Sequence, residues 1–342
     1  MAVSPRLKTC IFLLLVQILS ACASPLPYHT LSGPLSPRAG PIIRNTTGTA
    51  EVLDPNTRGF VPQGPATDGG GSANFNIPNI IWIVFSLLVG IPIAFAGIRG
   101  WRWTTGTGVG LACAVCVWAA FVNTVSAAGI PDLLLTGLTI AAFCIGFIIG
   151  LFKFGRLAGI ACLGVAGGLA MGIRLILLKD NLLISAMNVF ALNWVIIAFL
   201  GAAGGLTMIW WQRAGITIGS ASVGTFLIGL GIDLMVNKQA GMSRGLRYLF
   251  DRNIVHIADL IGKGYKPPIS AKLIMAASLL LIPALAYAQH RIFPRPFAPE
   301  DDHSDLNSLN MTGPYLDEKP SRMTRYSAWA GMKLRIGSRF ST

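Results

Sequence analysis

Residues 213–233 of the chain, RAGITIGSASVGTFLIGLGID, contain the features that decide its fold. Between Arg213 and Asp233 there is no charged residue, and the length is close to the roughly 20 residues that an α-helix needs to cross about 30 Å of hydrocarbon. Gly215 and Gly219 are four residues apart, so they lie on one face of such a helix and let a neighbouring backbone approach closely. The stretch therefore predicts a membrane-spanning helix that packs through glycine.

Six further segments share this length and apolar character. Of the 342 residues, 53% are hydrophobic and 12% are charged, whereas about a quarter of the residues in a soluble domain are charged. The sequence thus predicts an all-α fold, a polytopic membrane helix bundle over residues 78–290. The cores of its seven predicted transmembrane helices are Ile80–Ile98, Thr107–Ala127, Leu133–Leu151, Leu157–Leu178, Leu183–Leu206, Ala214–Val236 and Ile269–Ala288.

Three connections between these helices are short, basic and aromatic. Aligning them on Arg102, Arg156 and Arg213 gives an internal repeat with offsets of 54 and 57 residues. Each repeat is a helix, a tight turn and a glycine-rich helix that returns, so we expect three parallel hairpin repeats with the seventh helix outside the pattern. Short basic loops favour the cytoplasm, which places the N-terminus on the extracellular or luminal side.

The first 23 residues have the organisation of a secretory signal peptide. Arg6 and Lys8 precede an apolar run that is too short to span a bilayer, and the small residues that follow predict cleavage after Ala23. Residues 24–77 are rich in Pro, Gly, Ser and Thr and are predicted to form a disordered extracellular or luminal segment, in which Asn45 begins a glycosylation sequon. We therefore expect an integral protein of the plasma membrane or the endomembrane system.

Residues 291–342 are predicted to form a disordered cytoplasmic tail. The last part of this tail is basic and interleaved with aromatic residues. We interpret it as a solvated tail, with docking on anionic lipids of the cytoplasmic leaflet as the alternative. The tail and the flanks of the helices account for the net charge of +13, so we expect the lipid bilayer, and no nucleic acid, as the partner of this charge.

The predicted external loop over residues 237–268 contains apolar residues at helical spacing. They are Leu246, Leu249, Phe250, Ile254, Ile257, Leu260 and Ile261. This pattern predicts an amphipathic helix lying on the outer membrane surface. A lid over the bundle is the alternative.

Glycines at four-residue spacing mark the faces through which the helices are expected to touch. They include Gly106 and Gly110 in the second span, Gly164, Gly168 and Gly172 in the fourth, and Gly215 and Gly219 in the sixth. Hydrophobic attraction between helices is absent in lipid, so close backbone approach over small residues holds such a bundle together. We interpret these faces as intramolecular contacts, with a homodimer interface as the alternative.

Three polar residues stand out inside the apolar segments. Asn123, Arg174 and Asp233 lie 21, 18 and 20 residues after the turn arginines of their repeats, so they are expected at similar depth near the outer ends of the second, fourth and sixth helices. One interpretation is that each side chain reaches the outer headgroups. The others are a buried pair between Arg174 and Asp233, and a polar site for a substrate or an ion.

The sequence predicts no enzyme, cofactor or metal. None of the four histidines lies in a predicted span, and no catalytic motif or metal-ligand spacing is present. We favour a non-catalytic scaffold that organises membrane partners. A small-solute or ion transporter or channel, working through the Asn123, Arg174 and Asp233 level, is the alternative.

Two motifs point to a known family. One is the turn Gly97-Ile-Arg-Gly-Trp101, which leads into a glycine-rich helix, and the other is the stretch from Arg213 through Gly219 and Gly224 to Asp233. The chain resembles, from about Ile80 to His290, the domain shared by seven-transmembrane superfamily member 3 and transmembrane protein 198, including its fungal relatives. The resemblance implies a signal peptide, an external N-terminus and seven spans. It implies no catalytic residues and no particular activity.

Overall fold

The computed structural model describes residues 42–46, 49–53, 59–64, 75–124, 130–152, 155–184 and 191–293. Within these residues seven helices are long and apolar enough to cross a membrane, which confirms the predicted all-α seven-span bundle. They are α2 (Ile77–Ala96), α3 (Trp101–Thr124), α4 (Asp132–Leu151), α5 (Arg156–Leu177), α6 (Ala191–Trp210), α7 (Gln212–Asn237) and α10 (Ile269–Ile292). The predicted signal peptide, with cleavage after Ala23, and the tail beyond residue 293 lie outside the described residues.

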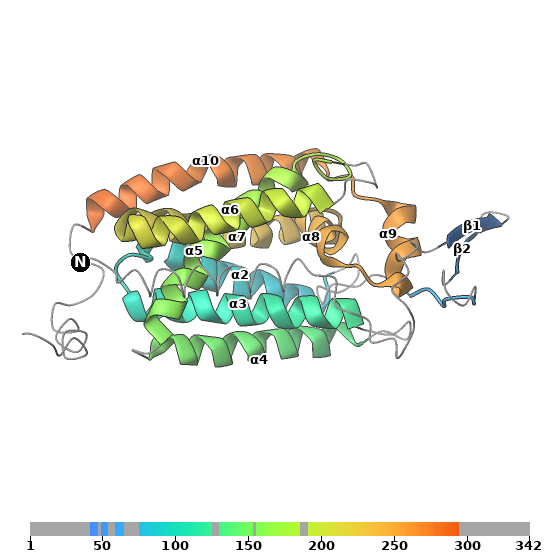
Figure 1. Cartoon of the computed structure of the whole chain (residues 1–342), viewed down its shortest axis with the longest axis horizontal. Helices are drawn as coiled ribbons and strands as arrows, with labels where there is room; N and C mark the ends of the chain where they lie inside the picture. Colours follow the sequence, from blue (N-terminus) through green and yellow to red (C-terminus); the bar gives the residue numbers. More distant parts are fainter. Residues whose placement is uncertain are drawn as a thin grey trace, which may run out of the picture. The chain divides into compact units, whose positions relative to one another are not determined.

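The helices of the bundle alternate in direction. α3, α5 and α7 begin at the end that carries the basic turns, here called the turn end (residues 97–103, 155–157 and 210–214), so they run parallel to one another (Figure 1). α2, α4, α6 and α10 begin at the opposite end, where the short helices α8 (Met242–Phe250) and α9 (Ile257–Lys263) lie. The predicted parallel direction of the repeats is therefore present.

The packing partners differ from the predicted hairpins. α3 packs most extensively on α4, α5 packs on α6, and α7 packs on α2 and α10, whereas α4 and α5, which one of the basic turns joins, touch only slightly. Among the described residues, α3, α5 and α7 form a row with α5 at its centre. The hairpins therefore set only the direction in which each helix runs. Each glycine-rich helix packs most extensively on a helix that is not its partner in the hairpin.

Glycine faces explain these partners. A Cβ added at Gly110 of α3 would lie 2.9 Å from the Phe143 ring of α4, and one added at Gly224 of α7 would lie 2.5 Å from the backbone nitrogen of Ala94 in α2. The predicted packing glycines lie at contacts between helices of this chain: Gly106 and Gly110 meet α4, and Gly164, Gly168, Gly172, Gly215 and Gly219 meet α6. Close approach at these contacts requires the absence of a side chain.

Two helix boundaries differ from the predicted cores. α3 begins at Trp101 instead of Thr107, because threonine hydroxyls in its first turns donate to carbonyls of their own helix, as Thr105 does to the carbonyl of Trp101 over 2.9 Å. α6 begins at Ala191 instead of Leu183. There the chain leaves α5 through a turn with Leu182 fully buried, and the Asn193 side chain donates to the Ile184 carbonyl over 3.0 Å.

The connection over residues 238–268, here called the α8–α9 segment, is not one amphipathic helix. It breaks between Asp251 and Asn253 into α8 and α9. Asp251 and Asn253 at the break are buried together with Arg247 and His256, whereas Arg252 is exposed. Polar groups therefore lie inside the segment, which differs from an amphipathic helix with one apolar and one water-facing side.

Part of the stretch predicted to be disordered is ordered. β1 (Ile42–Thr46) and β2 (Thr49–Leu53) form an antiparallel hairpin, and Val52 is fully buried. The backbone nitrogen of Gly64 donates to the Val255 carbonyl over 3.0 Å, and Gln63 bonds both Ile254 and Ala258. The composition of this stretch predicts disorder, but it does not reveal that β2 packs against α9. Asn45, the predicted glycosylation site, lies on β1.

Candidate functional site

Asp233 and the N-terminus of α8 meet at the end of the bundle opposite the turn end. The Asp233 carboxylate is fully buried and accepts hydrogen bonds from the Asn237 side chain over 2.8 Å and from the backbone nitrogen of Met242 over 2.5 Å. A side chain at Gly241 would collide with this carboxylate. Because a carboxylate at a helix N-terminus is electrostatically favourable, Asp233 fixes the first turn of α8.

Asn123 holds the other end of α8. Its side-chain nitrogen donates to the Phe250 carbonyl over 3.1 Å, and its side-chain oxygen accepts from the backbone nitrogen of Arg252 over 2.8 Å. The Phe250 ring lies between Trp118 of α3 and Trp194 of α6, with ring centroids 5.5 and 5.0 Å away. α8 is therefore anchored to the bundle at both of its ends.

Arg174 lies inside the bundle and has partners of its own. Its side chain is fully buried, and its five N–H groups all donate to neutral oxygens. Nε bonds the Ala170 carbonyl, Nη1 bonds Thr225 and Ser278 over 3.0 and 3.2 Å, and Nη2 bonds the carbonyl and the hydroxyl of Ser222 over 2.8 and 2.9 Å. One guanidinium thus joins α5, α7 and α10.

The three polar residues singled out in the sequence therefore do not share one site. Asn123 and Asp233 both hold α8, but the partners of Arg174 are elsewhere. Ser222 precedes Asp233 on α7 by 11 residues, about 16 Å along a helix axis. Side chains in a helix point back toward its N-terminus, so Arg174 reaches toward the middle of the bundle and away from Asp233.

The α8–α9 segment contains a buried ionic network. The i,i+4 spacing of Arg247 and Asp251 predicts a possible pair on a helix face, but it does not predict that the pair is buried or that His256 joins it. Arg247 Nε lies 2.8 Å from Asp251 Oδ2, and His256 Nδ1 lies 2.9 Å from the same oxygen. These three side chains are 0–3% exposed, so the charges are shielded from water. Arg244 and Asp259 form a second pair at 3.1 Å. Together the two pairs link α8 to α9.

Tyr265 attaches this segment to α5. Its hydroxyl donates to the Leu177 carbonyl over 3.0 Å, and its backbone exchanges hydrogen bonds with Asn181. Burial, together with the negative charges of Asp233 and Asp180, raises the pKa of the Tyr265 phenol. The phenol therefore remains a hydrogen-bond donor at physiological pH.

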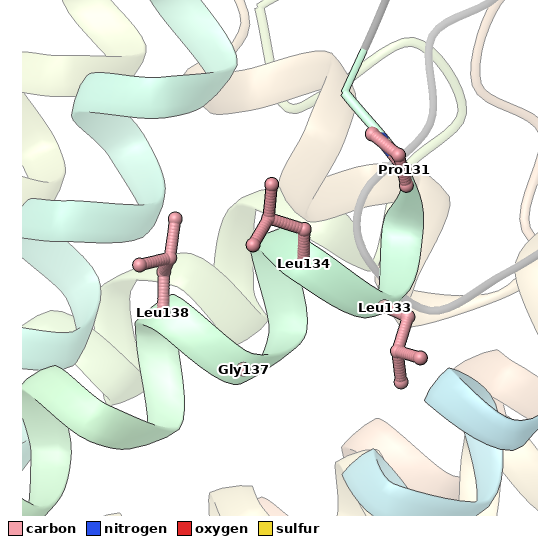
Figure 2. Close-up of a pocket in the computed structure, with 5 residues that line it drawn as sticks. All are labelled: Pro131, Leu133, Leu134, Gly137 and Leu138. Atoms are coloured by element: carbon pink, nitrogen blue, oxygen red, sulfur yellow. The ribbon is translucent and has the colours of Figure 1, made fainter.

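Two hollows in the described part of the chain lie away from these polar groups. One, of about 410 Å³, is lined by Pro131 and apolar residues of the first turns of α4 (Figure 2). The other, of about 170 Å³, lies among α5, α6 and α7 and is lined mainly by glycine and aliphatic residues, including Gly164, Gly168, Gly215 and Gly219. Its one hydroxyl, that of Thr207, donates to a carbonyl of its own helix. Both hollows are apolar and offer no convergent polar groups to a solute.

Comparison with known proteins fits this architecture. The sequence model of one family, described as the TM7S3/TM198-like domain, matches residues 83–290. The chain belongs to the TM7S3/TM198-like family. The match begins within α2 and ends within α10, and it includes the five spans between them and the α8–α9 segment. This TM7S3/TM198-like protein is therefore an integral, multi-pass membrane protein. No curated protein and no solved structure matches the chain.

The TM7S3/TM198-like bundle has a further polar contact near its turn end. Gln289 of α10 is 1% exposed; it donates to the Ala94 carbonyl of α2 over 2.6 Å and accepts from the Ser220 hydroxyl of α7 over 3.2 Å. Sequence reasoning missed it because the seventh apolar run was ended at Ala288. A polar residue immediately after such a run was the available signal.

The chemistry of this TM7S3/TM198-like site is that of a structural clamp. Among the described residues no group of three or more His, Cys, Asp or Glu side chains is placed to hold a metal ion. The buried Arg174 and Asp233 and the partly buried Asn123 direct their hydrogen bonds to the chain itself. What the arrangement does is to hold a folded segment rigidly on one end of the bundle.

Proposed function

We propose that the protein is a non-catalytic membrane scaffold that organises other membrane components. The observation that carries the proposal is that Asn123, Arg174 and Asp233, the polar residues singled out within the spans, are all occupied by partners in the chain itself. All five N–H groups of Arg174 donate to oxygens of α5, α7 and α10. Asp233 and Asn123 form hydrogen bonds with the backbone of α8. A transport site needs polar groups that are free to exchange partners with a solute.

A rigid surface at one end of the bundle supports the proposal. The α8–α9 segment is held by Asp233, Asn123 and Tyr265, and the hairpin of β1 and β2 rests on α9 through Gln63. Phe60, beside the hairpin, remains 65% exposed. A folded surface of this kind can bind a partner without the entropic cost of ordering a loop.

The same proposal includes the orientation of the protein in the membrane. The turn end is basic, and short basic loops favour the cytoplasm, so the α8–α9 segment is extracellular or luminal and the C-terminal tail is cytoplasmic. A glycosylation reporter fused after Thr342 tests this orientation, with a reporter inserted before Ile42 as the matched control. We expect modification of the control only. Modification at the C-terminus overturns the orientation.

Transport is the second candidate, and one observation favours it. Asn79 and Ser86 lie seven residues apart on the same face of α2, both are fully buried, and their side chains have no hydrogen-bond partner within the described structure. Unsatisfied polar atoms in a membrane interior mark a place that water or a small solute enters. If α2 lines a pathway, flux should depend on these two side chains.

Flux and assembly experiments separate the two candidates. Proteoliposomes containing wild type, Asp233→Asn or the pair Asn79→Leu with Ser86→Ala are tested for uptake of small ions and neutral solutes. The scaffold proposal expects negligible flux in all three. Flux in wild type that falls in either variant overturns it.

The positive test is purification from native membranes in mild detergent, followed by mass measurement. We expect a species of fixed stoichiometry larger than the 36.3 kDa chain. The matched pair of variants is Asp251→Asn, which breaks the buried network of the α8–α9 segment, and Asp132→Asn, which lies outside it. Assembly that survives Asp251→Asn as well as Asp132→Asn assigns partner binding to another surface.

A further inference from the structure

At the turn end, two arginines from different helices share one tryptophan ring. Trp101 is the first residue of α3 and is 8% exposed. The guanidinium carbons of Arg102, also on α3, and Arg156, the first residue of α5, lie 5.2 and 5.3 Å from the centre of its ring. Arg102 is exposed and Arg156 half-buried, so the outer sides of both guanidinium groups remain accessible.

No carboxylate of the described residues neutralises this pair. The aspartates of the helical region, Asp132, Asp180, Asp233, Asp251 and Asp259, all lie at or beyond the opposite end of the helices. The turn end has Arg99, Arg102, Arg156, Arg213 and, at the end of α10, Arg291. Cation–π contact holds the two guanidinium groups against Trp101, yet it leaves their charges uncompensated and mutually repulsive.

The backbone adds to the positive potential. α3 and α5 both begin here, and neither has an acidic residue in its first turn. The N-terminus of a helix carries a partial positive charge, so an arginine in the first turn is unfavourable unless an anion is nearby. Two such arginines, one on each of two adjacent helices, indicate that the balancing negative charge comes from outside the residues that the structure describes.

We propose that Arg102 and Arg156, positioned by Trp101, bind the phosphate of an anionic phospholipid headgroup. The planar, forked donors of arginine match phosphate oxygens in pairs. The 24 residues of α3 extend over about 36 Å, longer than a hydrocarbon core of about 30 Å, so its first turn lies at headgroup depth. Trp103, Trp210 and Trp211 are 44–67% exposed at the same end, as expected of an interfacial aromatic belt.

A lipid is a better occupant than a free phosphate ion because both arginines lie where lipid phosphates are concentrated. The site is independent of the scaffold proposal: it describes how the turn end meets the bilayer, whatever the opposite end binds. It also differs from the basic tail, since it is built from the ends of two spanning helices.

The test compares two arginine pairs at the same end of the full-length protein. Wild type, Arg102→Gln with Arg156→Gln, and the control Arg99→Gln with Arg291→Gln are placed in phosphatidylcholine nanodiscs with a minor fraction of fluorescent phosphatidylserine. Both variants lose two charges, and glutamine keeps much of the stem that covers the aromatic rings. Both pairs lose the diffuse attraction that any arginine has for an anionic surface, but only the first pair should lose paired hydrogen bonds to phosphate. We therefore expect the first pair to lower the preference for phosphatidylserine about tenfold more than the control does.

Equal losses of phosphatidylserine preference in the two double variants overturn the proposal, because they would mean that the lipid is attracted diffusely to the whole turn end. So does competition by inorganic phosphate at the concentration of the lipid, which would make the site one for a soluble anion. If the first variant does not fold, the proposal is tested by cross-linking of the wild-type protein. A photoreactive phosphatidylserine should then cross-link to peptides containing residues 99–103 and 155–157. Cross-links confined to other segments overturn the proposal.

Discussion

Removing a hydroxyl beside Arg174 should destabilise the protein more than removing Arg174 itself. The guanidinium is fully buried and has no carboxylate among its five hydrogen-bond acceptors. In Ser222→Ala one Nη2 N–H loses its acceptor while the charge remains. A hydrogen bond to a charged group contributes about 1.5–3 kcal/mol. We expect the free energy of unfolding to fall by about that amount.

Arg174→Met removes the charge and all its donors at once. The three hydroxyls around it keep donor bonds of their own, from Ser222 to Gly167, from Thr225 to Ala221 and from Ser278 to Met275. Replacing buried charged groups by apolar side chains of similar size is often neutral or stabilising. We therefore expect stability within about 1 kcal/mol of wild type, and a cost of about 1 kcal/mol or less when Ser222→Ala is added.

The assay is a double-mutant cycle, with unfolding in denaturing detergent followed by helical circular dichroism. Thr139→Ala is the control, because Thr139 is 2% exposed and its hydroxyl donates to a carbonyl of its own helix over 2.8 Å. Its loss should cost no more than about 0.6 kcal/mol, the average for a hydrogen bond between membrane helices, because this bond lies within a single helix. The reasoning is refuted if Ser222→Ala costs no more than Thr139→Ala, or costs the same with and without Arg174.

Three further predictions concern packing, the α8–α9 segment and pH. Gly168→Ala should lower the free energy of unfolding by about 2 kcal/mol because the added Cβ would collide with the backbone of Leu200. In the control Gly137→Ala the added Cβ has nothing within 4 Å, so stability should be unchanged or slightly higher. Similar effects of the two substitutions would contradict this prediction. Asn123→Ala should speed hydrogen exchange of the Arg252 amide about tenfold, and unchanged exchange would exclude Asn123 as an anchor. Because the Tyr265 pKa is raised on folding, stability should fall as pH rises above 10.0, the ordinary tyrosine value; Tyr265→Phe should abolish this fall, and a fall that persists assigns it to another group.

The features imposed by the hydrocarbon core of the bilayer could be predicted from the sequence. Apolar length predicts each span, and the spacing of Arg102, Arg156 and Arg213 predicts that α3, α5 and α7 run parallel. Four-residue glycine spacing predicts which faces touch. These features are local in the chain, so single-sequence reasoning reaches them.

Contacts between distant segments could not be predicted in the same way. The pattern of Gly106 and Gly110 shows that α3 has a small-residue face, yet it does not say whether α2 or α4 covers it. Equal depth left a pair between Arg174 and Asp233 open as an alternative to headgroup contact, but rotation about the helix axis and the direction of the arginine side chain exclude the pair. In the α8–α9 segment, Arg247 and Asp251 have the same spacing whether they are buried or face water.

The partnership of α2 with α7 has a consequence for biogenesis. α2 is the first of the described spans to leave the ribosome, and its principal neighbour begins more than a hundred residues later. Until that neighbour is synthesised, the buried polar side chains of Asn79 and Ser86 have only lipid or the insertion machinery beside them. The nascent chain therefore passes through a stage at which α2 lacks its principal neighbour, and truncation before residue 212 should leave a product that cellular quality control removes.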